Sequence, residues 1–176
     1  MASTQPSTPS PKRQAATDST VASLDTGIKK EDRRNISDQL VKVLADTYTL
    51  LVKTHVYHWN VVGPIFLPLH ELTEKQYQDL FEAADTIAER IRALGHPTPL
   101  SFEEMLPKTL VTEETSNRTA GDMVAHLVAD HEQLTKRIRE VASAADKADD
   151  FVTTDMLTDR LTFHEKAIWM LRAIET

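Results

Sequence analysis

Four long segments of the chain carry apolar residues at the spacing of an α-helix. They lie at about 36–61, 68–94, 119–141 and 150–174. Prolines are almost absent from them, and no stretch shows the apolar and polar alternation that is typical of a half-buried strand. The second segment starts near Pro68 and ends before Gly95, residue types that favour helix starts and helix ends respectively. The pattern predicts an all-α protein.

The connections between these segments predict the architecture. The third segment opens with Thr119-Ala-Gly-Asp122, which resembles a capping box. The connection before it, residues 95–117, contains three prolines and a short apolar piece at 102–106. A link of this length can cross a bundle from end to end. We therefore expect a four-helix bundle over residues 27–176, with one long crossover that contains a short helix.

The composition excludes several kinds of chemistry. The 176 residues include 4 glycines, which are widely spaced, so a glycine-rich phosphate loop is excluded. With 0 cysteines, disulfides, thiol nucleophiles and cysteine-ligated metal centres are excluded. A net charge of -7 argues against a protein that mainly wraps nucleic acid. Histidines and carboxylates remain as the chemically active groups.

The N-terminal region and the most apolar window indicate the cellular location of the protein. Residues 1–26 are rich in Ser, Thr, Pro and Ala, and we expect a disordered tail there. This region lacks the apolar stretch of a signal peptide. The most apolar window, 61–72, is interrupted by glycine and proline, so no membrane span is expected. A cytoplasmic protein is predicted.

The second segment carries two pairs of potential metal ligands at a spacing of four. These are His70 with Glu74, and Asp85 with Glu89. At about 100° per residue, all four side chains fall on one arc about a third of a turn wide. Imidazole and carboxylate donors suit non-heme iron or manganese. Charged pairs at this spacing also line solvated helix faces, and the second pair taken alone fits that alternative better.

The positions of the two pairs point to a site shared between two chains. Glu74 and Asp85 lie 11 positions apart, which is about 16 Å along a helix, so one metal ion cannot bind both pairs of one chain. The pairs are, however, symmetric about the middle of the helix. Antiparallel packing against a second copy across a two-fold axis would place His70 and Glu74 opposite that copy's Asp85 and Glu89.

The remaining histidines allow two interpretations. His58 and His55 extend apolar stripes of the first segment, where a histidine is more often a satisfied core residue than a ligand. His131 and His164 lie on similar stripes of the third and fourth segments, and we expect them to be core residues.

Several motifs resemble the Dps family, the ferritin-like DNA-protection proteins of starved cells. The motifs are Lys53-Thr-His-Val-Tyr-His-Trp-Asn60, Gly63-Pro64, Leu69-His70-Glu71, Gln76-Tyr77, Asp85-Thr-Ile-Ala-Glu-Arg90 and His164-Glu-Lys-Ala-Ile-Trp-Met170. The resemblance covers about residues 35–174. It implies a hollow homo-dodecamer of four-helix subunits, with di-iron ferroxidase sites at the two-fold interfaces.

The resemblance also implies roles for individual residues. As iron ligands it implies His58, His70 and Glu74 from one subunit, and Asp85 and Glu89 from its neighbour. This is the same pairing that the symmetry of the helix suggests. Glu74 stands where other members carry Asp, so its role as a direct ligand stays open.

Three further residues match family positions outside this ligand set. Trp59 matches a tryptophan thought to quench radicals made at the site, or alternatively it packs at the dimer seam. Asp155 and Asp159 match acidic positions that line iron-entry pores at three-fold axes. Their alternative role is favourable placement of acids near a helix N-terminus.

The resemblance implies an enzyme that oxidises Fe(II) with hydrogen peroxide and stores ferric mineral. The competing hypothesis is a nucleoid protein that binds and compacts DNA. The tail carries only Lys12 and Arg13 as cations, and acidic residues interrupt the basic cluster at 29–34 that follows. We therefore expect weak DNA binding through the tail at most. A bundle that binds no metal is the third possibility.

Overall fold

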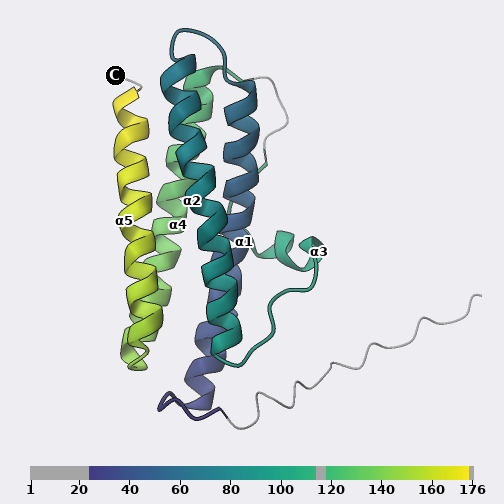
Figure 1. The fold of residues 1–176 in the computed structure, drawn as a ribbon, viewed down its shortest axis with the longest axis vertical. Coiled ribbons are helices and arrows are strands. Elements are labelled where there is room, and N and C mark those ends of the chain that lie inside the picture. Colours follow the sequence, from purple (N-terminus) through teal and green to yellow (C-terminus); the bar gives the residue numbers. More distant parts are fainter. Residues whose placement is uncertain (1–23, 114–117, 175–176) are drawn as a thin grey trace, which may run out of the picture.

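The computed structural model describes residues 24–113 and 118–174, and these form a bundle of long helices (Figure 1). The elements are α1 (Lys30–Asn60), α2 (Phe66–Ala93), α3 (Phe102–Met105), the 3-10 turn η1 (Leu106–Lys108), α4 (Ala120–Lys147) and α5 (Phe151–Ile174). The described residues contain no strand, so the predicted all-α four-helix bundle is confirmed. None of the helices in these ranges combines the length and the apolar character needed to cross a membrane.

Two antiparallel helix pairs make up the bundle. α1 packs mainly on α2, and α4 packs mainly on α5, with α3 and η1 in the long crossover beside α1 (Figure 1). Contacts between α1 and α4 show that these two helices are antiparallel, because Asp46 pairs with Arg137 and Tyr57 with His126. The loop between α1 and α2 lies at the same end of the bundle as the end of α5.

Side-chain caps define where two of the long helices begin. Thr119 accepts a hydrogen bond from the backbone N–H of Asp122, and Asp122 accepts one from the backbone N–H of Thr119, which confirms the predicted capping box. The carboxylate of Asp150 accepts from the backbone N–H of Thr153 at 3.0 Å and thereby caps α5. α1 begins at Lys30, which is earlier than predicted. The prediction missed this start because the first turns of the helix are polar and carry no apolar periodicity.

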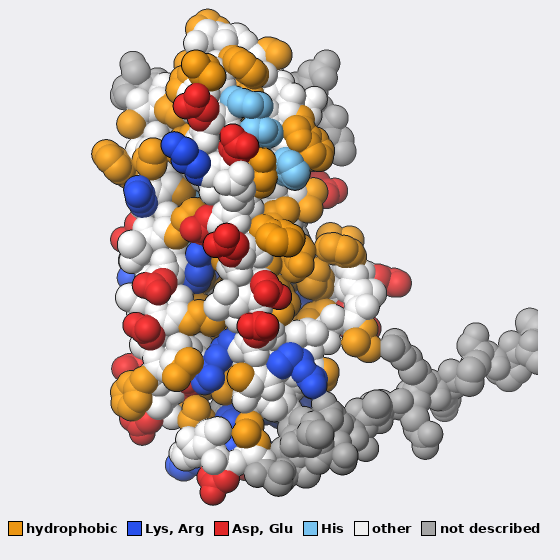
Figure 2. All heavy atoms as spheres, viewed as in Figure 1, with side chains coloured by type: hydrophobic (Ala, Val, Ile, Leu, Met, Phe, Trp, Pro, Cys, Tyr) orange, Lys and Arg blue, Asp and Glu red, His pale blue; other side chains and the backbone are white. Residues whose placement is uncertain are grey.

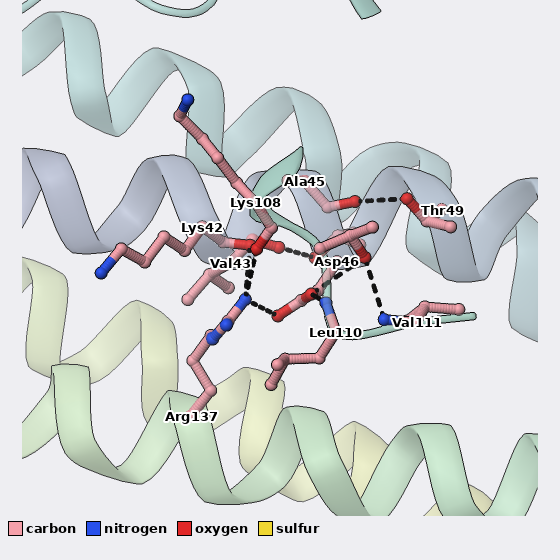
Figure 3. Close-up of polar contacts among 11 residues, drawn as sticks. Lys42, Val43, Ala45, Asp46, Thr49, Lys108, Leu110, Val111 and Arg137 are labelled. Atoms are coloured by element: carbon pink, nitrogen blue, oxygen red, sulfur yellow. Dashed lines mark hydrogen bonds and ion pairs between the residues drawn. The ribbon is translucent and has the colours of Figure 1, made fainter. Parts of the chain in front are cut away.

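Buried ionic contacts attach the crossover to the bundle. Asp46 on α1 is fully buried and accepts hydrogen bonds from Arg137 at 2.6 Å, from the backbone N–H of Leu110 at 2.6 Å and from the Thr109 hydroxyl at 3.0 Å (Figure 3). Burial raises the pKa of Asp46, while these partners oppose the shift. The same carboxylate thus holds α1, α4 and the crossover together.

A histidine pair lies in the middle of the apolar core. His131 on α4 and His164 on α5 are both fully buried, and their Nδ1 atoms are 2.8 Å apart. One imidazole must therefore donate to the lone pair of the other. This confirms the prediction that both are core residues.

Candidate metal centre

His58 and His70 lie against each other at the end of the bundle that carries the α1–α2 loop. His58 is in the last turn of α1, and His70 is in the second turn of α2. Their rings stack with centroids 3.8 Å apart and an interplanar angle of 17°. The short loop between α1 and α2 brings these two residues together.

Crossed hydrogen bonds fix the orientation of both rings. Nδ1 of His58 lies 2.9 Å from the backbone oxygen of His70, and Nδ1 of His70 lies 3.0 Å from the backbone oxygen of His58. A carbonyl oxygen can only accept, so each Nδ1 carries the proton and donates it. In the neutral rings both Nε2 atoms then keep their lone pairs, which is the arrangement that metal-binding histidines require.

The Thr73 hydroxyl supports this arrangement. Thr73 is fully buried and donates to the backbone oxygens of Leu69 at 2.7 Å and His70 at 3.0 Å. The carbonyl of His70 therefore accepts from both Thr73 and His58. The sequence reasoning did not identify this residue, because a threonine inside a helix carries no pattern of its own.

The acidic candidates divide into one that is near the histidines and two that are not. Glu74 lies one helical turn after His70 and is half-buried. Asp85 and Glu89 are exposed farther along α2. In the part of the chain that the structure describes, no three His, Cys, Asp or Glu side chains gather in an arrangement that could hold a metal ion. One chain therefore does not bring the whole predicted ligand set together at one place.

Aromatic rings connect the histidine pair to the surface. Tyr77 meets His58 edge to face at 5.2 Å, and it stacks on His55 at 4.2 Å. His55 in turn lies 4.2 Å from Trp59, whose side chain is 64% exposed. His55 is thus an aromatic neighbour of the candidate site. The sequence could have placed Tyr77 near the candidate site, because it lies two helical turns after His70.

The face around these residues is unusually apolar for a surface. Val52, Val56, Phe66 and Phe81 are exposed on α1 and α2. In Figure 2 histidine side chains gather near one end of this view, with apolar and acidic side chains beside them and further acidic side chains along the same face. Exposed apolar groups of this extent are typical of protein contact surfaces.

The two acidic residues of α5 lie in a different region. Asp155 and Asp159 are exposed and line a shallow hollow together with Thr86 and Phe151. Because Asp150 caps α5 and no acid lies in its first turn, the helix N-terminus does not account for either residue. The structure separates these two side chains from the histidine pair.

Comparisons with known proteins show the family to which this chain belongs. The family described as Ferritin-like domain matches residues 37–175. A DNA protection during starvation protein of Helicobacter pylori is 36% identical over 130 residues, which are 73% of this chain and 90% of that protein. The chain is a member of the Dps family.

Further relatives and solved structures are also similar to this chain. A protein of Nostoc sp. named as low temperature-induced is 43% identical over 152 residues, which are 85% of each chain. The crystal structure of a Dps protein from Bacillus brevis superposes with a TM-score of 0.80 at 33% identity, covering 85% of this chain and 100% of that one. The Vibrio cholerae Dps structure, described as a member of a superfamily of ferritin-like diiron-carboxylate proteins, gives a TM-score of 0.80 at 28% identity, covering 85% of this chain and 94% of that one.

Proposed function

We propose that this Dps protein oxidises ferrous iron at sites shared between two subunits and stores the ferric product inside a hollow assembly of twelve copies. The observation that carries the proposal is the crossed pair His58 and His70, which presents two Nε2 lone pairs. The same helix α2 exposes Asp85 and Glu89 at a distance that one chain cannot bridge. An antiparallel copy of α2 would supply them.

The residues divide the work of the reaction between them. His58 and His70 bind Fe(II) through Nε2, and Glu74 extends the site with a carboxylate. Asp85 and Glu89 of the second copy add negative charge, which favours the harder ferric ion. One hydrogen peroxide molecule accepts one electron from each of two ferrous ions and, with two protons, its O–O bond breaks to give two water molecules. Hydroxyl radical is thereby avoided.

The biological role follows from this chemistry. Removal of ferrous iron and peroxide in one reaction prevents oxidative damage to DNA. Relatives from Helicobacter pylori and Brevibacillus brevis are named DNA protection during starvation proteins. We place the activity in the cytoplasm, near the nucleoid. Asp155 and Asp159 would attract ferrous ions to an entry pore, since acidic channels concentrate cations.

Direct DNA binding is the second candidate, and the structure gives it less support. Arg33 in the basic cluster at 29–34 is only 7% exposed and donates to the backbone oxygen of Ile28 at 2.7 Å. Lys29, Lys30 and Arg34 remain exposed. Three such cations beside two acids on an acidic protein offer few phosphate contacts. Most of the predicted tail lies outside the described residues.

The proposed function can be tested by iron titration of the assembled protein. Metal-free protein is loaded anaerobically with Fe(II), and hydrogen peroxide or dioxygen is then added while ferric absorbance is followed. We expect the wild-type protein to consume one peroxide per two ferrous ions, and the variant His58→Ala/His70→Ala to lose this fast phase. His96→Ala, a change outside every proposed site, serves as the matched control. Wild-type kinetics in the double variant would contradict the proposal.

A further inference from the structure

A cleft of about 310 Å³ lies between α2 and α5, on the side of α2 where Gln76 is buried. Its apolar walls come from Leu72 on α2 and from Phe163 and Met170 on α5. This volume is at the lower end of the range for small-molecule sites, about 300–1,000 Å³. The residues of the cleft take no part in the proposed iron chemistry.

Gln76 forms an unpartnered polar group of this cleft. Its side chain is only 2% exposed, and neither the amide oxygen nor the amide nitrogen has a hydrogen-bond partner within residues 24–113 and 118–174. Burial of such a group without a partner costs about 1–3 kcal/mol. Because Gln76 lines the cleft, a molecule that binds there can supply the missing partners for its buried donor and acceptor.

The mouth of the cleft is positively charged. Lys75 and Lys166 line it, both are exposed, and neither forms an ion pair with another described residue. Asp79 also lines the cleft, but its carboxylate pairs with Arg160 at 2.7 Å. Because Asp79 is paired with Arg160, the two lysine ammonium groups give the mouth a positive charge beside an apolar cavity. This combination favours binding of an organic anion over binding of a cation.

We propose that this cleft binds a small organic carboxylate with an apolar body and a hydroxyl or amide group at its far end. The carboxylate lies between Lys75 and Lys166 at the mouth. The apolar body packs on Phe163, and the far polar group exchanges hydrogen bonds with the amide of Gln76. This assignment is independent of the proposed iron chemistry.

The test uses the assembled full-length protein, free of metal, and 4-hydroxyphenylacetate as the probe. This compound carries a carboxylate, an aromatic ring and a hydroxyl group in the required order. We expect calorimetry to give a Kd below about 1 mM. Phenylacetate, which lacks the hydroxyl group, and 4-hydroxyphenylethanol, which lacks the carboxylate, should each bind about tenfold more weakly. Absence of binding by the first probe would overturn the proposal.

Variants locate the binding in the cleft. Gln76→Leu keeps the side-chain volume and should weaken binding of 4-hydroxyphenylacetate about tenfold without affecting phenylacetate. Lys75→Gln/Lys166→Gln should weaken both carboxylates and remove the dependence of binding on salt. The matched control Lys136→Gln/Lys147→Gln changes exposed lysines of α4 and should bind as the wild type does. Equal affinity in the wild type and in the Lys75/Lys166 variant would overturn the assignment, and that variant alters only exposed residues.

Discussion

The buried pair His131 and His164 should make the stability of the bundle depend on pH. Burial, followed by repulsion from Arg160, lowers the pKa of His131 to about 3. Burial also lowers the pKa of His164, with smaller contributions from His131 and Arg160. The hydrogen bond between the two Nδ1 atoms requires a lone pair on one of them, and the lowered pKa values keep both rings neutral at pH 7.

The size of the effect follows from proton linkage. A histidine in the unfolded chain has a pKa of about 6.5, so the unfolded state takes up protons that the folded state excludes as the pH falls below that value. The free energy of unfolding therefore decreases toward acid pH. For His131 alone, the loss between pH 7 and pH 5 is about 2 kcal/mol, and His164 acts in the same direction.

Denaturant unfolding at two pH values measures this loss. The wild type and His131→Gln/His164→Gln are unfolded in guanidinium chloride at pH 7 and pH 5, at one protein concentration because assembly affects apparent stability. We expect the double variant to lose about 2–4 kcal/mol less than the wild type on acidification. His126→Gln, a half-exposed histidine of α4, serves as the control. The same pH dependence in both proteins would refute the reasoning, whatever their absolute stabilities.

Three further predictions concern other parts of the chain. Asp155→Asn/Asp159→Asn should slow iron uptake most at low salt, where attraction of cations is least screened; an uptake rate unchanged at every ionic strength would exclude a role in iron entry. Asp150→Ala removes the helix cap and the 2.5 Å ion pair with Arg90, and should lower the free energy of unfolding by about 3 kcal/mol; a loss below about 1 kcal/mol in denaturant titration would contradict this. Deletion of residues 2–26 should leave assembly and iron oxidation unchanged while weakening any DNA retardation in gels, and loss of assembly would show that the tail is structural.

The helices could be predicted because their apolar periodicity is a local property of the sequence. The same is true of the capping box at Thr119. The early start of α1 could not be predicted, because its first turns are polar and become helical only by continuation from the residues that follow. The attachment of the crossover through Asp46 was also inaccessible, since it joins residues separated by 63 to 91 positions.

Helical spacing predicted which residues could form the candidate site, and it could not predict how these residues contact one another. The positions of His70 and Glu74 on one arc of α2 follow from helical spacing alone. The crossed hydrogen bonds with His58 depend on how the short α1–α2 loop aligns two backbones, which spacing does not determine. The motif Gln76-Tyr77 is part of the family resemblance, but the ring contacts of Tyr77 and the burial of Gln76 were beyond prediction because they depend on neighbouring helices. The shared nature of the site remains a prediction from spacing.

Recovery of activity on mixing two inactive variants tests the shared site most directly. His58→Ala/His70→Ala and Asp85→Ala/Glu89→Ala are dissociated, mixed in equal amounts and reassembled, with assembly size confirmed. In random pairing half of the two-fold contacts are mixed, and each mixed contact restores one of its two sites. The account predicts about a quarter of the wild-type rate of iron oxidation, while each variant reassembled alone stays inactive. No recovery in correctly reassembled protein would contradict the account.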